Sequence, residues 1–213
     1  TRLDLTDVYY GLSLQLLVYL AVALIRWDEI TNSSHFLNIP EIAGKVPSAT
    51  ILPAGAMYQP IQNIFIRTDG PLDKDSAWAE IRKKLRMTGI FMDDLEVVRL
   101  MDKTSSAHSD LVQVQFTKSG LGAKSPVVSQ EKIEALLNFA IAKVEDTCSK
   151  IISGRIDVLP FSKKQLKGCR YCPFGSFCTF DVLIEGNQYR VLKDIPKDVI
   201  WAEIKRYGEG EKK

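Results

Sequence analysis

Three cysteines near the C-terminus, Cys169, Cys172 and Cys178, are spaced C-x2-C-x5-C. Thiolates are soft metal ligands, and two of them on one tight turn can bind the same centre. An iron–sulfur cluster and most structural zinc sites take four protein ligands, so this motif is one short. The spacing predicts a metal or cluster site, and it leaves iron–sulfur, zinc and simply reduced thiols open.

The sequence offers no obvious fourth ligand. His35 and His108 are distant from the motif and have no ligand spacing. Cys148 lies four residues after Val144 on the apolar face of an expected helix, so we predict a buried small hydrophobic residue there. The fourth ligand is then expected outside this sequence.

Gln15 and Tyr19 are four residues apart in an otherwise apolar segment. This spacing places both polar tips on one face of a helix. Buried amide and phenol groups need hydrogen-bond partners, which either a protein core or a cleft holding DNA or ordered water can supply.

Several short motifs imitate a nuclease site. Such sites need two carboxylates to hold Mg²⁺ and a lysine to stabilise developing charge. Gly154–Asp157 spells G-R-I-D, but it follows a long expected helix, and the E-x-K matches Glu203–Lys205 and Glu211–Lys213 lie on a terminal helix and in a charged tail. None lies at the end of a buried strand, so we predict no complete nuclease metal site in this chain.

Basic and aromatic residues surround the first cysteine. Together they suit single-stranded DNA; alternatively, the aromatic residues pack around the cysteine loop and the lysines are solvated. They are Lys163, Lys164, Lys167, Arg170, Tyr171, Phe174, Phe177 and Phe180.

The bulk composition is that of an ordinary globular domain, with 213 residues, 46% hydrophobic residues, 25% charged residues and a net charge of +2. The apolar run Leu16–Ile25 is shorter than the roughly 18 residues that suggest a membrane span, so no membrane is expected. The sequence opens on Thr1 and soon enters an apolar helix, from which we expect a piece of a longer protein.

Periodicity and turn residues predict the elements that carry these motifs. We expect helices over 5–27, 75–87 with a stop at Gly89, 93–101, 129–153 with a stop at Gly154, and 197–207; strands over 54–58 and 111–116; and a loop over 32–48. The helix over 5–27 is nearly all apolar in its second half, which predicts burial.

Five blocks resemble the AddB-type component of bacterial AddAB helicase/nucleases, in the same order and over nearly the whole chain. They are Leu3–Leu20, Pro53–Tyr58, Glu96–Asp102, the Cys169–Cys178 loop with Phe180-Asp181, and Tyr189-Arg190.

This resemblance implies an α/β fold, a part of a RecB-type PD-(D/E)xK nuclease domain with a C-terminal cysteine-rich iron–sulfur loop. Residues 1–160 would belong to the nuclease domain without its upstream metal-binding strands, 161–190 would bind the cluster, and 191–213 would form a terminal helix and charged tail. Gln15 and Tyr19 match the Q-x-x-x-Y helix beside the active site. Cys169, Cys172 and Cys178 match three ligands of a [4Fe–4S] cluster, and the fourth ligand and the Mg²⁺ ligands lie upstream in the family.

The resemblance also implies a function: an ATP-dependent helicase and Mg²⁺-dependent DNA exonuclease that processes double-strand ends for recombinational repair. DNA and the AddA-type helicase/nuclease protein, as the other half of a heterodimer, would be its partners, in the cytoplasm. The 213-residue chain alone is expected to be inactive as a nuclease, with the cluster absent or substoichiometric. The alternative is a non-catalytic zinc or iron–sulfur interaction module.

Overall fold

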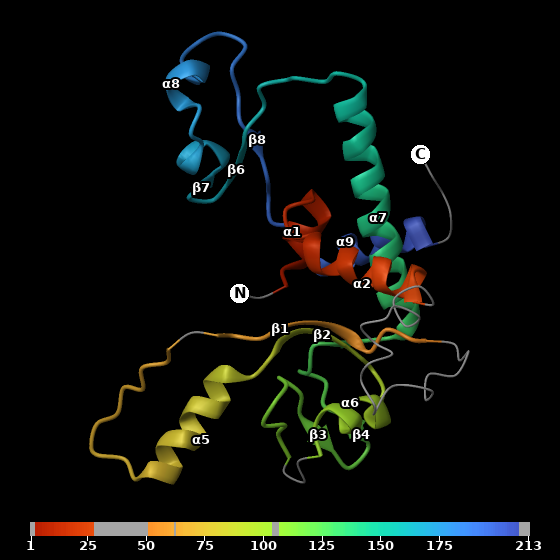
Figure 1. The fold of residues 1–213 in the computed structure, drawn as a ribbon, viewed down its shortest axis with the longest axis vertical. Helices are drawn as coiled ribbons and strands as arrows, with labels where there is room; N and C mark the ends of the chain where they lie inside the picture. Colours follow the sequence, from red (N-terminus) through yellow and green to blue (C-terminus); the bar gives the residue numbers. More distant parts are fainter. Residues whose placement is uncertain (1–2, 28–50, 62, 104–106, 209–213) are drawn as a thin grey trace, which may run out of the picture.

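The computed structural model describes residues 3–27, 51–61, 63–103 and 107–208. It is a mixed α/β structure in which a helical body, a small sheet and a cysteine-bearing lobe are arranged along the longest axis (Figure 1). The loop predicted over 32–48 and the charged tail lie outside the described residues. In the part of the chain that is described, no helix has both the length and the apolar character needed to cross a membrane.

The helical body is built around α7 (Gln130–Ile152), which α2 (Gln15–Ile25) and α9 (Lys197–Gly208) both contact. The helix α1 (Leu5–Tyr10) packs on α9. The predicted helices over 129–153 and 197–207 are therefore confirmed within a residue at each end. The fully or nearly fully buried side chains that join these helices are Val8, Leu17, Leu136, Phe139, Ala140, Ile200 and Ile204.

The expected helix over 5–27 is two helices. Gly11 adopts a left-handed conformation with φ 82°, which suits a residue without Cβ, and its N–H and that of Leu12 close the end of α1. Asp4 caps α1 as expected, accepting a hydrogen bond from the N–H of Thr6 at 2.8 Å. The expected burial of the second half is also wrong: α2 buries Leu17 and Ala21 only, and Ile25 is 72% exposed.

The main sheet has the order β1-β2-β5. The strand β1 (Gly55–Tyr58) confirms the prediction over 54–58 and pairs antiparallel with β2 (Thr88–Met92), which pairs parallel with β5 (Val127–Val128). Gly89, expected to stop a helix, lies inside β2 opposite Met57. A Cβ on Gly89 would meet the Ala56 carbonyl oxygen at 2.0 Å, so the close approach of the two strands requires glycine there.

A second apolar cluster lies beneath this sheet, under α6 (Leu95–Met101). Its members Val112, Val114 and Phe116 alternate with more exposed residues, as predicted, but 111–116 is not one continuous strand. Only β3 (Phe116–Thr117) pairs, with β4 (Gly120–Leu121). The reason is the turn at Ser109, whose hydroxyl accepts hydrogen bonds from the N–H groups of Leu111 and Val112 and ends regular pairing there.

The helix α5 (Lys74–Leu85) confirms the expected helix but buries none of its residues. Its stripe residue Trp78 is exposed, and Figure 1 shows α5 standing beside the sheet instead of across the helical body. Its order comes from local interactions such as its N-cap, in which Asp73 accepts hydrogen bonds from the N–H groups of Asp75 and Ser76 at 3.0 Å.

Candidate functional site

The cysteines lie in a lobe of residues 161–191, the cysteine lobe, which projects from the end of α7 (Figure 1). Its frame is β6 (Phe161–Lys163), which pairs antiparallel with β7 (Leu166–Lys167) and parallel with β8 (Arg190–Val191). Because β6 enters the lobe and β8 leaves it, their pairing closes the lobe at its base. Hydrogen bonds from Arg190 N–H to the Pro160 carbonyl and from Leu192 N–H to the Ser162 carbonyl, both 2.9 Å, hold this closure.

The three cysteines occupy two short helical turns. Cys169 lies in η1 (Gly168–Tyr171), and Cys172 follows directly and donates its N–H to the Cys169 carbonyl at 3.2 Å. Cys178 ends α8 (Gly175–Cys178), with its N–H bonded to the Phe174 carbonyl at 2.9 Å. All three are free thiols on the surface.

These residues fit a soft metal centre in donor type but not in number. No three His, Cys, Asp or Glu side chains are gathered as metal ligands anywhere in the described ranges. Cys148 does not complete the set, and its predicted burial is wrong: it is exposed on α7. The reason is that α7 extends past its neighbours, so every residue from 145 to 152 is exposed whatever its place in the apolar stripe.

Tyr189 is a lobe residue to which sequence reasoning gave no role of its own. Its ring meets Phe180 edge to face at 5.0 Å between centroids, and the Lys167 ammonium lies 5.2 Å from its centroid. Burial, followed by the charge of Cys169 and a hydrogen bond with it, raises the pKa of Tyr189. The phenol is therefore a neutral group beside the first cysteine. An aromatic residue preceding the closing strand was the available signal.

The basic residues of the lobe already have partners. Lys163, half-buried, reaches Asp7 at 2.5 Å and Asp4 at 3.2 Å, and so ties the lobe to the start of α1. Lys164 pairs with Asp194 at 2.9 Å, and the Arg170 guanidinium lies 5.4 Å from the Tyr171 ring centroid. The aromatic residues divide between the two predicted alternatives: Phe180 packs inside the lobe, whereas Tyr171, Phe174 and Phe177 are exposed.

Gln15 and Tyr19 lie on one face of α2, as their spacing predicts. The Gln15 side-chain amide donates a 2.7 Å hydrogen bond to the Tyr19 hydroxyl. Gln15 is exposed and Tyr19 is 62% exposed, so the pair presents amide and phenol groups on the surface and is not part of the core.

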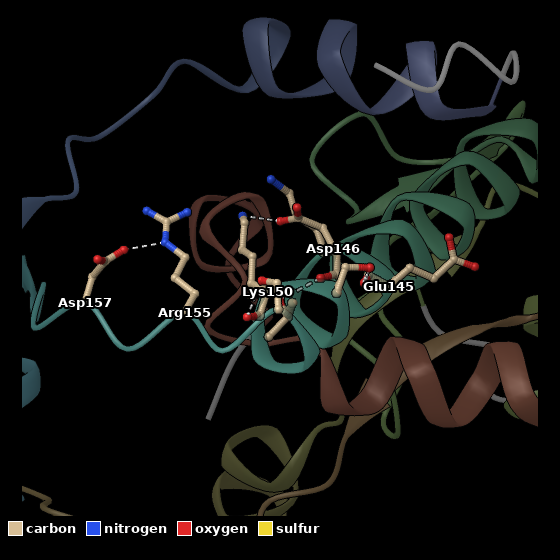
Figure 2. A network of polar contacts seen from close by, with 9 residues as sticks. Glu145, Asp146, Lys150, Arg155 and Asp157 are labelled. Carbon is tan, nitrogen blue, oxygen red and sulfur yellow. Dashed lines mark hydrogen bonds and ion pairs between the residues drawn. The ribbon is translucent and has the colours of Figure 1, made fainter.

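The motifs that imitate a nuclease site form ordinary surface contacts. Figure 2 shows Asp157 paired with Arg155, and Lys150 paired with Asp146 at 2.5 Å, beside Glu145 at the end of α7. Gly154 ends α7 as expected, with φ 73° and its N–H bonded to the Ile151 carbonyl.

The E-x-K match on α9 is equally ordinary. Glu203 pairs with Arg206 at 3.3 Å on that helix. The second match, Glu211–Lys213, lies outside the described residues.

No protein-family model matches the chain. Curated proteins do match it along nearly its whole length, and the relatives below are each named as the B-type component of an ATP-dependent helicase/deoxyribonuclease. The protein of Moorella thermoacetica is 37% identical over 93% of this chain, that of Clostridium kluyveri 32% over 94%, and that of Pelotomaculum thermopropionicum 36% over 95%. In each case the match spans only 16% of the relative's length. The chain is therefore homologous, over almost all of its residues, to one segment of the AddB family of ATP-dependent helicase/deoxyribonuclease proteins.

Proposed function

We propose that the chain is part of an ATP-dependent helicase/exonuclease protein that processes double-strand DNA ends for recombinational repair. The observation that carries this proposal is the similarity of 93–95% of the chain to relatives named as components of a helicase/deoxyribonuclease. DNA is the substrate, the AddA-type helicase/nuclease protein is the partner, and the complex acts in the cytoplasm.

Within that protein, the segment forms part of a RecB-type PD-(D/E)xK nuclease domain, and Gln15 and Tyr19 face the DNA channel. Their exposure supports this role, because a surface amide and phenol can exchange their mutual hydrogen bond for contacts to a nucleic acid or to ordered water. The Mg²⁺ ligands of the nuclease come from other parts of the longer protein, and Mg²⁺ supplies the Lewis acid for phosphodiester hydrolysis.

Cys169, Cys172 and Cys178 are three ligands of a [4Fe–4S] cluster whose fourth thiolate comes from outside this segment. Support comes from the donor type and from the lobe itself, whose ends are joined by β6 and β8 while the thiols stay accessible. The cluster supplies a structural cross-link, because four thiolates from two distant segments hold one inorganic core. The chain's own contribution is to keep three of them within one short loop.

Nuclease assays on linear duplex DNA with Mg²⁺ test the proposal. We expect the full-length protein with its partner to degrade DNA from the ends, and the 213-residue chain to cut nothing, because its described residues hold no paired carboxylates with a lysine at a strand end. The proposal is overturned by a full-length complex that leaves duplex ends intact. Cleavage by the isolated chain that Asp157→Asn or Glu203→Gln abolishes would show that these surface motifs are the site.

A further inference from the structure

The side chain of Tyr189 contacts residues at both ends of the cysteine motif. Lys167 precedes Cys169 by two residues, and Phe180 follows Cys178 by two residues. The Lys167 ammonium lies 5.2 Å from the Tyr189 ring centroid, and the Phe180 ring lies 5.0 Å away in an edge-to-face arrangement. One ring therefore holds together the two ends of the segment that carries all three thiols.

The backbone delivers Tyr189 to this position. After Phe180 the chain makes a turn organised by Asp181, whose carboxylate accepts the N–H of Leu183 at 2.9 Å and whose carbonyl accepts the Asn187 amide at 2.9 Å. Tyr189 then leads into β8, which is fixed beside β6.

At the other end of the motif, Gly168 lies against the Phe161 ring, where a Cβ would meet a ring carbon at 3.1 Å. Phe161 belongs to β6, the strand that pairs with β8. The loop between Lys167 and Phe180 is thus closed at a defined width, although every residue from 164 to 179 is exposed.

We propose that Tyr189 is a positioning residue, whose ring closes the cysteine loop and keeps Cys169, Cys172 and Cys178 preorganised for a soft metal centre. This inference rests on the proposed ligand role of the three cysteines. An exposed loop loses conformational entropy when it folds around a metal, and a loop that is already closed loses less. Tyr189 therefore raises metal affinity without being a ligand.

The test is Co²⁺ titration of the 213-residue chain, followed by the thiolate-to-cobalt charge-transfer band. Tyr189→Ala removes both ring contacts and weakens Co²⁺ binding by on the order of tenfold. Tyr189→Phe keeps the ring and stays within about threefold of the unmodified chain. Tyr171→Ala is the matched control, because that tyrosine is exposed in the same lobe and contacts only Arg170 among the ring contacts described. It leaves Co²⁺ binding unchanged.

A metal-free readout separates this inference from the proposed function. Trypsin cleaves after Lys167 and Arg170 when the loop opens, so Tyr189→Ala raises the cleavage rate there by roughly tenfold and Tyr171→Ala does not. If the unmodified chain gives no charge-transfer band, the ligand role fails and the proteolysis still decides the clamp. Equal cleavage and equal Co²⁺ affinity for Tyr189→Ala and the unmodified chain overturn the inference. So does a Tyr189→Phe variant as impaired as Tyr189→Ala.

Discussion

Phe139 and Phe177 show how differently the helical body and the cysteine lobe are held. Phe139 in α7 is completely buried, lies edge to face with Tyr207 at 5.0 Å and stacks with Tyr9 at 6.3 Å. Phe177 in α8 is 89% exposed. The same side chain therefore contributes apolar burial in one region and almost none in the other.

The difference means that the two regions depend on different interactions. The helical body encloses a core of apolar side chains and needs no ligand to fold. The cysteine lobe buries almost nothing, so its order comes from two short strand pairings, the Tyr189 contacts and the ion pairs of Lys163. A bound metal contributes folding free energy directly, and the lobe is the region that such a contribution would change most.

Matched Phe→Ala substitutions should separate the two regions most strongly. We expect Phe139→Ala to lower the free energy of unfolding by about 3–5 kcal/mol, because it removes a fully buried ring and leaves a cavity. Phe177→Ala should stay within about 0.5 kcal/mol, since its ring is in solvent. Urea unfolding followed by far-UV circular dichroism measures both. Equal midpoints for the two variants would show that the core is not where the structure places it.

Replacing Lys163 should have an intermediate effect, confined to the attachment of the lobe. Lys163→Met leaves Asp4 and Asp7 without their cation, and we expect the junction to weaken by about 1–2 kcal/mol, between the values for exposed and buried pairs. Lys164→Met is the control: its ion pair with Asp194 is exposed on both sides, so about 0.5 kcal/mol or less is expected. Hydrogen exchange at the amides of Arg190 and Leu192 reports the junction, and equal protection in both variants would contradict a stabilising role for Lys163.

The same junction should depend on pH. Burial by itself raises the pKa of Asp4, but the Thr6 N–H and the Lys163 ammonium lower it overall, below its ordinary 3.8. Burial lowers the pKa of Lys163, but hydrogen bonds to Asp7 and Asp4 raise it overall, above its ordinary 10.5.

The Asp4 contribution is therefore present above pH 3.8 and is lost as the pH falls below it, and the Lys163 contribution is present below pH 10.5 and is lost as the pH rises further. Amide protection at the junction, measured by hydrogen exchange and corrected for the intrinsic exchange rate, should be flat between these limits in the unmodified chain. A fall in protection near neutral pH would contradict this assignment.

Gln15→Ala should have the smallest effect on stability. The side chain is exposed and its hydrogen bond to Tyr19 is on the surface, so we expect a change within about 0.5 kcal/mol. In the full-length protein the same substitution should reduce DNA cleavage per folded molecule far more than it reduces stability. A large drop in melting temperature with unchanged cleavage would instead assign Gln15 a structural role.

Long periodic elements could be predicted from the sequence because their signals are local. The 23-residue α7 has a continuous apolar stripe, an N-cap at Ser129 and a stop at Gly154, and its expected bounds are confirmed. The central strand β2 was missed because Ile90, Phe91 and Met92 form a run too short to assign, and Gly89 resembled a helix stop. What makes it a strand is pairing with residues at least 30 positions away in both directions.

The composition of the candidate site was predictable, but its geometry was not. The cysteine spacing and the Gln15–Tyr19 spacing follow from the sequence itself. Burial of Cys148 was wrong because helical periodicity gives the direction of a side chain and not how far neighbouring helices extend. The Tyr189 contacts join residues 9 and 22 positions apart, which no local pattern encodes.

Iron and acid-labile sulfide analysis, with absorbance near 400 nm (about the usual iron–sulfur charge-transfer region), tests the central claim most directly. It compares the full-length protein, its Cys169→Ser variant and the 213-residue chain. The account predicts a stoichiometric four-iron cluster in the full-length protein, its loss in the variant, and an absent or substoichiometric cluster in the 213-residue chain. A stoichiometric four-iron cluster in the 213-residue chain, or four-coordinate zinc bound there through Cys148, would contradict it.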